Sequence, residues 1–110
     1  MAERYLRRHG LSTVRRNFHC RLGELDLVMR DGATTVFVEV RYRRHRAFGG
    51  GLASVTRHKQ LKMTRAAAMF LAFQPALADR PCRFDVLAVS GSPAEPSFDW
   101  VRDAFQAPGQ

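Results

Sequence analysis

The sequence has 110 residues, which is enough for one domain with one hydrophobic core. Hydrophobic residues make up 45% and charged residues 25%, values that are ordinary for a soluble globular protein. The charge balance is unusual, because 18 Lys and Arg against 10 Asp and Glu give a net charge of +8. This balance predicts a polyanionic partner, most often nucleic acid, with an acidic membrane surface or a plain solvated face as the alternatives.

Targeting, membrane and zinc-binding segments are not expected. The N-terminal stretch MAERYLRRHG lacks the apolar region of a secretory signal, and the longest apolar run, residues 66–73, is too short to cross a bilayer. Cys20 and Cys82 form neither a CxxC pair nor a Cys/His spacing typical of zinc sites. We therefore expect a cytoplasmic protein with two reduced thiols and no membrane partner.

The N-terminal half predicts one short helix followed by three strands. In chain order, these elements cover residues 2–9, 11–21, 23–30 and 34–43. Gly10 stops the helix, and the first strand is expected at an edge of the sheet. Asp31-Gly32 predicts a hairpin between the second and third strands, because glycine adopts positive φ without steric cost.

The C-terminal half predicts a basic glycine-rich loop, a helix and two strands. In chain order, these elements cover residues 43–54, 56–74, 83–89 and 98–101. Thr56 is the expected N-cap of the helix and Pro75 ends it, while a turn of helix follows the last strand. The fold class is therefore α/β, with a mixed central sheet flanked by helices in one domain, residues 1–106, and a flexible tail, residues 107–110.

The hairpin carries carboxylates among its valines and leucines. Side chains alternate faces along a strand, and a two-residue turn at Asp31-Gly32 would pair Glu24 with Glu39 and residue 26 with residue 37. The carboxylates of Glu24, Asp26 and Glu39 would then share one face. The opposite, apolar face would contain Leu25, Leu27, Met29, Val36, Val38 and Val40.

Two explanations of this acidic face stay open. Like charges opposite one another destabilise a sheet, so the face is either solvent-exposed and screened by nearby arginines, or the acids bind a hard cation. Oxygen ligands favour Mg²⁺, Mn²⁺ or Ca²⁺ over zinc. In a basic protein, such a site predicts a phosphodiester substrate. Asp85 also interrupts an apolar strand, and we expect a buried salt bridge with Arg83 there rather than a metal site.

Three sequence blocks carry a resemblance to a known family. The stretches GELDLV…VFVEVRYR, SVTRHKQLK and CRFDV, in this order, resemble the YraN family, and the first block resembles the PD-(D/E)xK nuclease signature. The resemblance covers residues 5–105. It implies a restriction-endonuclease-like fold, similar to that of archaeal Holliday-junction resolvases, and a predicted nuclease activity.

The resemblance assigns catalytic residues one by one. The catalytic set that it implies is Asp26, Glu39, Arg41, Glu24 and Gln60. Asp26 and Glu39 match the motif acids, Arg41 occupies the usual lysine position, and Gln60 belongs to the Lys-Gln pair at the start of the second helix.

The implied cofactor is Mg²⁺ or Mn²⁺, held by Asp26, Glu39 and the carbonyl of Val40. Arg41 departs from the motif, because a guanidinium stays protonated in proteins and so can stabilise negative charge but not accept a proton as a lysine amine can. The first-helix Glu of related nucleases has no counterpart either, since Glu3 lacks the matching spacing. Whether the start is truncated or the helper is absent stays open.

Basic residues around this site are the expected nucleic-acid contacts. They are Arg43, Arg44, Arg46, Arg57, Lys59 and Lys62, from the basic loop and the start of the helix that follows it. The main hypothesis is a metal-dependent DNA endonuclease, possibly specific for branched DNA, and a homodimer would suit the cutting of two strands. The alternatives are a nucleic-acid-binding module with little or no catalysis and, ranked last, a small interaction protein.

Overall fold

The structure is a computed structural model that describes residues 1–43 and 55–107. Five strands form one sheet whose order follows the chain. Their bounds are Ser12–Cys20 (β1), Gly23–Asp31 (β2), Thr34–Tyr42 (β3), Cys82–Gly91 (β4) and Pro96–Phe105 (β5). β3 and β4 are parallel and the other neighbours are antiparallel, so the predicted mixed sheet and the edge position of β1 are confirmed.

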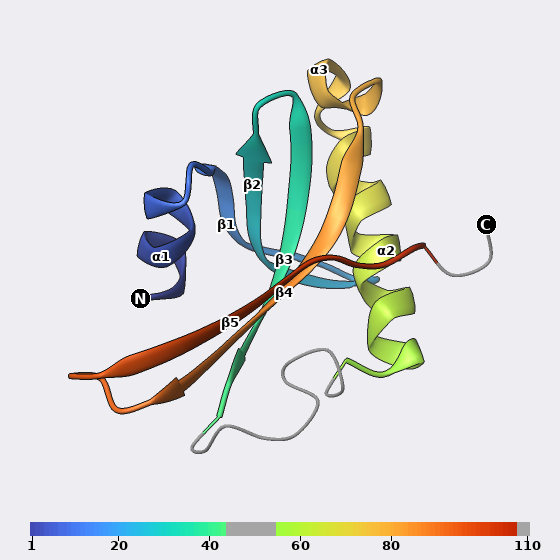
Figure 1. The fold of residues 1–110 in the computed structure, drawn as a ribbon. Coiled ribbons are helices and arrows are strands. Elements are labelled where there is room, and N and C mark those ends of the chain that lie inside the picture. The colour runs from blue at the N-terminus through green and yellow to red at the C-terminus, as the bar shows by residue number, and fades with distance from the viewer. Residues whose placement is uncertain (44–54, 108–110) are drawn as a thin grey trace.

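Helices cover both faces of the sheet (Figure 1). The first helix is Ala2–Arg8 (α1), and the crossover between the parallel strands contains Arg57–Ala72 (α2) and Pro75–Ala78 (α3). On the α2 side the core includes Phe37, Met63 and Phe70. On the α1 side it includes Leu6 and Met29, together with the valines of β3. These two apolar layers confirm the predicted α/β class.

The predicted register of the β2–β3 hairpin is wrong by two residues. Asp31 pairs with Thr34, so the two loop residues are Gly32 and Ala33 rather than Asp31 and Gly32. Gly32 has φ +61°, as a glycine in the first position of a tight hairpin loop requires. Glu24 therefore does not pair with Glu39 as expected. The last observed pair is Leu27 with Val38, and extending this register by one residue places Asp26 opposite Glu39.

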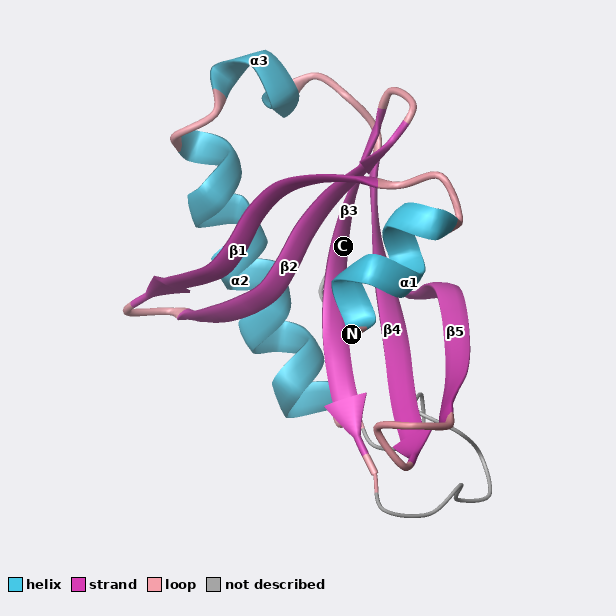
Figure 2. Cartoon of the chain, turned by 90° about the vertical axis from the view of Figure 1, so that its left-hand side faces the viewer, coloured by secondary structure: helices cyan, strands magenta, loops and turns pink. Residues whose placement is uncertain are grey.

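Alternation along β2 also breaks near Asp26. Leu25 was expected on the same face as Leu27, but it packs in the α2-side core whereas Leu27 packs in the α1-side core. Asn17 lies opposite this break on β1 with φ +50°, and the pairing of β2 with β3 starts only at Leu27. Figure 2 shows β1 and the first half of β2 bending away from β3.

The C-terminal end differs from the expectation as well. α3 was not predicted, and β5 continues to Phe105 where the sequence indicated a turn of helix. The pairing of β5 with β4 shifts register between Phe84 and Val86, and Asp103 adopts φ +50°. This irregularity lets the strand continue, so that Phe105 stacks on Phe84 with ring centroids 4.9 Å apart.

A buried polar cluster ties β4 to β5. Asp85 is fully buried and accepts hydrogen bonds from Arg83 Nε at 3.0 Å, from Trp100 Nε1 at 3.0 Å and from the Asp103 amide at 2.9 Å. Arg83 also reaches Asp31 at 2.9 Å. The predicted Arg83–Asp85 salt bridge is thus confirmed, and it belongs to the packing of the sheet.

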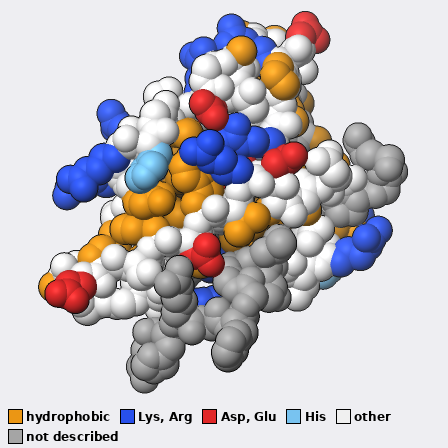
Figure 3. All heavy atoms as spheres, viewed as in Figure 1, with side chains coloured by type: hydrophobic (Ala, Val, Ile, Leu, Met, Phe, Trp, Pro, Cys, Tyr) orange, Lys and Arg blue, Asp and Glu red, His pale blue; other side chains and the backbone are white. Residues whose placement is uncertain are grey.

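The exposed surface carries many basic side chains. Figure 3 shows Lys and Arg side chains on several parts of one face, with Asp and Glu side chains scattered between them. No helix in the described part of the chain is long and apolar enough to cross a membrane.

Candidate active site

Asp26 lies where β2 separates from β3. Its Oδ2 atom accepts a hydrogen bond from the backbone N–H of Val40 at 2.8 Å. In a regular ladder this N–H would bond to a carbonyl of the neighbouring strand. The Asp26 carboxylate replaces that carbonyl, and it is therefore fixed at the point where the two strands diverge.

Glu39 lies next to Asp26 and is almost fully buried, with 3% of its surface exposed. Burial raises the pKa of the Glu39 carboxyl, and so do the negative charge of Asp26 and a hydrogen bond between the two carboxyl groups. Lys59 and Arg41 act in the opposite direction on this pKa without cancelling the rise. A close carboxyl pair therefore exists, formed by Asp26 and Glu39 rather than by Glu24 and Glu39.

Two cationic side chains approach the buried carboxylate. Arg41 Nη1 lies 3.3 Å and Lys59 Nζ 3.7 Å from Glu39 Oε2. Lys59 belongs to the first turn of α2, where its backbone N–H donates to the capping hydroxyl of Thr56 at 3.1 Å. The cap predicted from the sequence is thus present, and it positions Lys59 against the acid pair. The sequence had indicated Lys59 only as a phosphate contact, because the docking of α2 on the sheet has no local signal.

Two residues of the expected catalytic set have side-chain partners other than Asp26 and Glu39 in the described chain. Glu24 Oε2 is 3.0 Å from Nδ1 of His19, and its side chain is half exposed. The Gln60 side-chain amide donates to the carbonyl of Val55 at 3.2 Å, which holds it at the start of α2. Glu24 lines the same hollow as Lys59, and the catalytic roles of Glu24 and Gln60 stay predictions.

The expected nucleic-acid contacts fall into separate places. Arg43 is half-buried, and its backbone N–H extends the sheet by donating to Val89 at 2.8 Å. Arg57 is exposed at the first residue of α2, and Lys62 is exposed one turn further along. Arg44 and Arg46 lie outside the described residues, as does most of the predicted basic loop.

One surface hollow contains Asp26, and a second contains Lys59, the cationic neighbour of Glu39. The first, of about 410 Å³, is lined by Asp26, Val40 and, from α1 and β1, Glu3 and Arg16. The other, of about 300 Å³, lies at the β1–β2 turn, and its charged lining residues are Arg21, Glu24, Lys59 and Lys62. The sequence predicted no catalytic role for Glu3, because its spacing does not match that of the first-helix Glu in related nucleases. In the structure Glu3 nevertheless lines the same hollow as Asp26. Asp26 is therefore accessible from the α1 side of the sheet.

Replacing Glu39 should stabilise the fold at neutral pH. The raised pKa means that the folded protein holds this proton more tightly than the unfolded chain, so stability falls as pH rises from about 4 through the folded pKa. Glu39→Gln removes the buried charge, and we expect about 1 kcal/mol of added stability at pH 7 but little below pH 4. Urea unfolding at both pH values measures the difference.

The matched control is Glu95→Gln, because Glu95 is exposed and its backbone N–H, not its side chain, makes the hydrogen bonds to Ser92. It should change stability little at either pH. A Glu39→Gln protein that is less stable than the wild type at pH 7 would show that the carboxylate is held as a favourable ion pair.

Similarity to known proteins agrees with the sequence blocks. A model of the family described as "Uncharacterised protein family UPF0102" matches residues 1–89, a range that includes Asp26, Glu39 and Lys59. A UPF0102 protein of Xanthomonas campestris pv. campestris (strain B100) is 56% identical over 105 residues, covering 96% of this chain and 84% of the relative. One of Pseudomonas aeruginosa (strain LESB58) is 51% identical over 105 residues, covering 94% and 84%. The protein belongs to the UPF0102 family, which is the YraN family that its sequence blocks indicated.

Proposed function

We propose that this protein is a metal-dependent nuclease that hydrolyses DNA phosphodiester bonds at Asp26 and Glu39. The observation that supports this most is the close carboxyl pair at the end of the β2–β3 ladder. One of its members is buried, and its pKa is raised although Lys59 and Arg41 lie against it. Lys59 and Arg41 therefore leave the pair incompletely neutralised, and a bound divalent ion would remove the remaining repulsion.

The available donor atoms fit Mg²⁺ or Mn²⁺. These ions are commonly bound by one or two carboxylates and complete their coordination with water and substrate phosphates. Asp26 and Glu39 supply two carboxylates, and the Val40 carbonyl faces β2 because the N–H and carbonyl of one strand residue point to the same neighbour. No group of three or more His, Cys, Asp or Glu side chains that could enclose a metal occurs in residues 1–43 and 55–107. The two carboxylates and the Val40 carbonyl therefore suit an ion whose remaining coordination positions are filled by water and by substrate phosphates.

The proposed chemistry divides among the side chains. A bound divalent ion would polarise the scissile phosphate and lower the pKa of a coordinated water. Asp26 and Glu39 would hold and orient this centre, with the Val40 amide fixing the Asp26 carboxylate. Arg41 and Lys59 would stabilise the negative charge that develops on the phosphate.

Lys59 compensates for the arginine at the motif lysine position. A guanidinium remains protonated in proteins, so Arg41 can contribute charge but cannot exchange a proton. The Lys59 amine can do both, and it lies 3.7 Å from the same carboxylate oxygen that Arg41 approaches. The departure of Arg41 from the motif therefore leaves the proposed site with a group able to transfer a proton.

Cleavage of labelled DNA tests the proposal. Linear, flap and four-way-junction substrates are incubated with Mg²⁺ or Mn²⁺ and the wild type, Asp26→Asn, Glu39→Gln or the control Glu95→Gln. We expect the wild type and Glu95→Gln to cut, and each acid-pair variant to be slower by about 100-fold or more, because its metal contact is lost. EDTA should abolish the activity.

Two results would contradict this proposal. Cutting that survives both Asp26→Asn and Glu39→Gln would place the activity elsewhere. Wild-type protein that binds DNA in EDTA but cuts no substrate with either metal would identify a nucleic-acid-binding module on a nuclease scaffold.

A separate prediction distinguishes Lys59 from its neighbour Lys62. Both line the hollow at the β1–β2 turn, but Lys59 is the one with a contact to Glu39. Lys59→Met should lower the rate at saturating DNA by about 10- to 100-fold, as for loss of a group that acts in the transition state. Lys62→Met should weaken DNA binding and leave that rate nearly unchanged.

Single-turnover cleavage and binding in EDTA separate the two effects. A Lys59→Met protein that cuts at the wild-type rate once saturated would restrict Lys59 to phosphate binding.

A further inference from the structure

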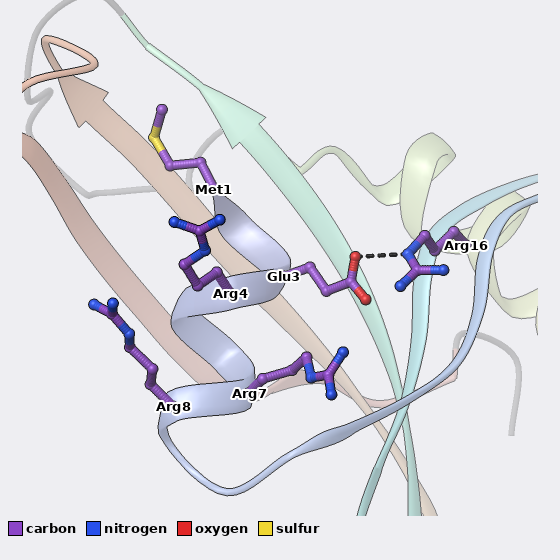
Figure 4. A pocket seen from close by; sticks show the side chains of 6 residues that line it. All are labelled: Met1, Glu3, Arg4, Arg7, Arg8 and Arg16. Carbon is purple, nitrogen blue, oxygen red and sulfur yellow. Dashed lines mark hydrogen bonds and ion pairs between the residues drawn. The ribbon is translucent and has the colours of Figure 1, made fainter.

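Three exposed arginines project from α1 around one surface hollow. Arg4, Arg7 and Arg8 line it together with Met1, Glu3 and Arg16, and its volume is about 500 Å³ (Figure 4). On a helix, residues three and four apart are neighbours, so Arg4 is adjacent to both Arg7 and Arg8. Like charges at these spacings repel, and the helix has only seven residues over which to offset that cost.

The described part of the chain neutralises this cluster only in part, through the attraction between Glu3 and Arg7. Glu3 is the one acid among the residues that line the hollow. It is already engaged by Arg16, whose Nε lies 2.7 Å from its Oε1, and by the hydroxyl of Thr13. These hydrogen bonds lower the Glu3 pKa to about 2, so the carboxylate stays ionised and paired with Arg16. In the described chain, no carboxylate forms an ion pair with Arg4, Arg7 or Arg8.

Helix electrostatics explain only part of the cluster. Arg7 and Arg8 lie in the last turn of α1, where cations interact favourably with the helix dipole. Arg4 lies in the first turn, where a cation is unfavourable. An external anion would satisfy all three guanidinium groups, because Arg binds phosphate oxygens with a planar array of donors.

The position of the cluster indicates which anion it fits. The arginine hollow shares Met1, Glu3 and Arg16 with the hollow that contains Asp26 and Val40. A chain of phosphates with one member at Asp26 would therefore continue over Arg16 to α1. A membrane surface fits less well, since a membrane-bound helix exposes its apolar side chains whereas Ala2 and Leu6 of α1 are buried in the core.

We propose that Arg4, Arg7 and Arg8 bind backbone phosphates of the nucleic acid that flank the phosphate at Asp26. They form a phosphate-binding surface on the α1 side of the sheet, separate from the basic residues of α2. This inference rests on the proposed nuclease function for its substrate, but not on catalysis. The acid pair would then lie between two basic surfaces that hold the substrate from either side.

A matched pair of double variants tests this surface. Arg4→Gln/Arg8→Gln removes two charges from the hollow, and Arg30→Gln/Arg80→Gln removes two exposed charges from β2 and from the residues after α3. Binding of labelled duplex and four-way-junction DNA is measured in EDTA over a range of KCl concentrations, after circular dichroism and thermal unfolding show that both variants are folded.

Each lost phosphate contact should lower the slope of log affinity against log salt by about 1. We therefore expect the α1 variant to lose about 2 from the slope and about tenfold or more in affinity at low salt, and the control to keep both close to wild type. A variant that behaves like the control would overturn the inference.

The remaining outcomes separate this inference from the nuclease proposal. Loss of binding in the α1 variant, with no cleavage by the wild type, supports the surface and rejects the nuclease. Cleavage by the wild type, with equal binding by both double variants, rejects the surface and keeps the nuclease. Wild-type protein that binds no DNA at low salt rejects both. An α1 variant that loses binding to phosphatidylglycerol vesicles but not to DNA would make this a membrane contact and overturn the inference.

Discussion

The hydrogen bond from the Val40 amide to the Asp26 carboxylate determines the geometry of the proposed site. It takes the place of a ladder bond at the point where β2 leaves β3, and so it holds an acid where a sheet would normally place a carbonyl. Glu39 is brought to the same point by β3, which the parallel β4 supports along its other edge. The carboxyl pair is thus formed by β2 and β3, two strands with neighbours on both edges of the sheet.

The surrounding charges follow from the layers on either side of the sheet. α2 docks with its capped first turn near Glu39, which brings the Lys59 amine to the buried carboxylate. α1 covers the other face, and its arginines line a hollow that shares Glu3 and Arg16 with the hollow beside Asp26. Neighbouring basic groups raise the local concentration of a polyanion, and the acid pair between them would repel it without a bound cation. A bound metal ion would thus offset the negative charge of Asp26 and Glu39 and allow a polyanion to approach them.

Features with local signals were predictable from the sequence. The helix stopped by Gly10, the Thr56 cap and the Arg83–Asp85 pair each depend on neighbouring residues, and the structure contains all three. The register of the hairpin was wrong because Asp31-Gly32 does not reveal which loop position the glycine occupies, and the face of Leu25 was wrong because no pattern marks the break at Asp26. The alternation of side chains along each strand was enough to place Glu24, Asp26 and Glu39 in one acidic group. It was not enough to predict that Asp26, rather than Glu24, lies beside Glu39. The contact of Lys59 with Glu39 depends on how a helix docks across a long crossover, which short-range patterns do not specify.

The central claim is that Asp26 and Glu39 are held together for a divalent cation. Calorimetric titration of Mn²⁺ into the wild type, Asp26→Asn and Glu39→Gln tests it without requiring any substrate. The account predicts binding by the wild type that strengthens as pH rises through the raised pKa of Glu39, because the metal must displace that proton, and much weaker binding by both variants. Wild-type affinity that is equal to that of both variants, or that does not change with pH, would contradict it.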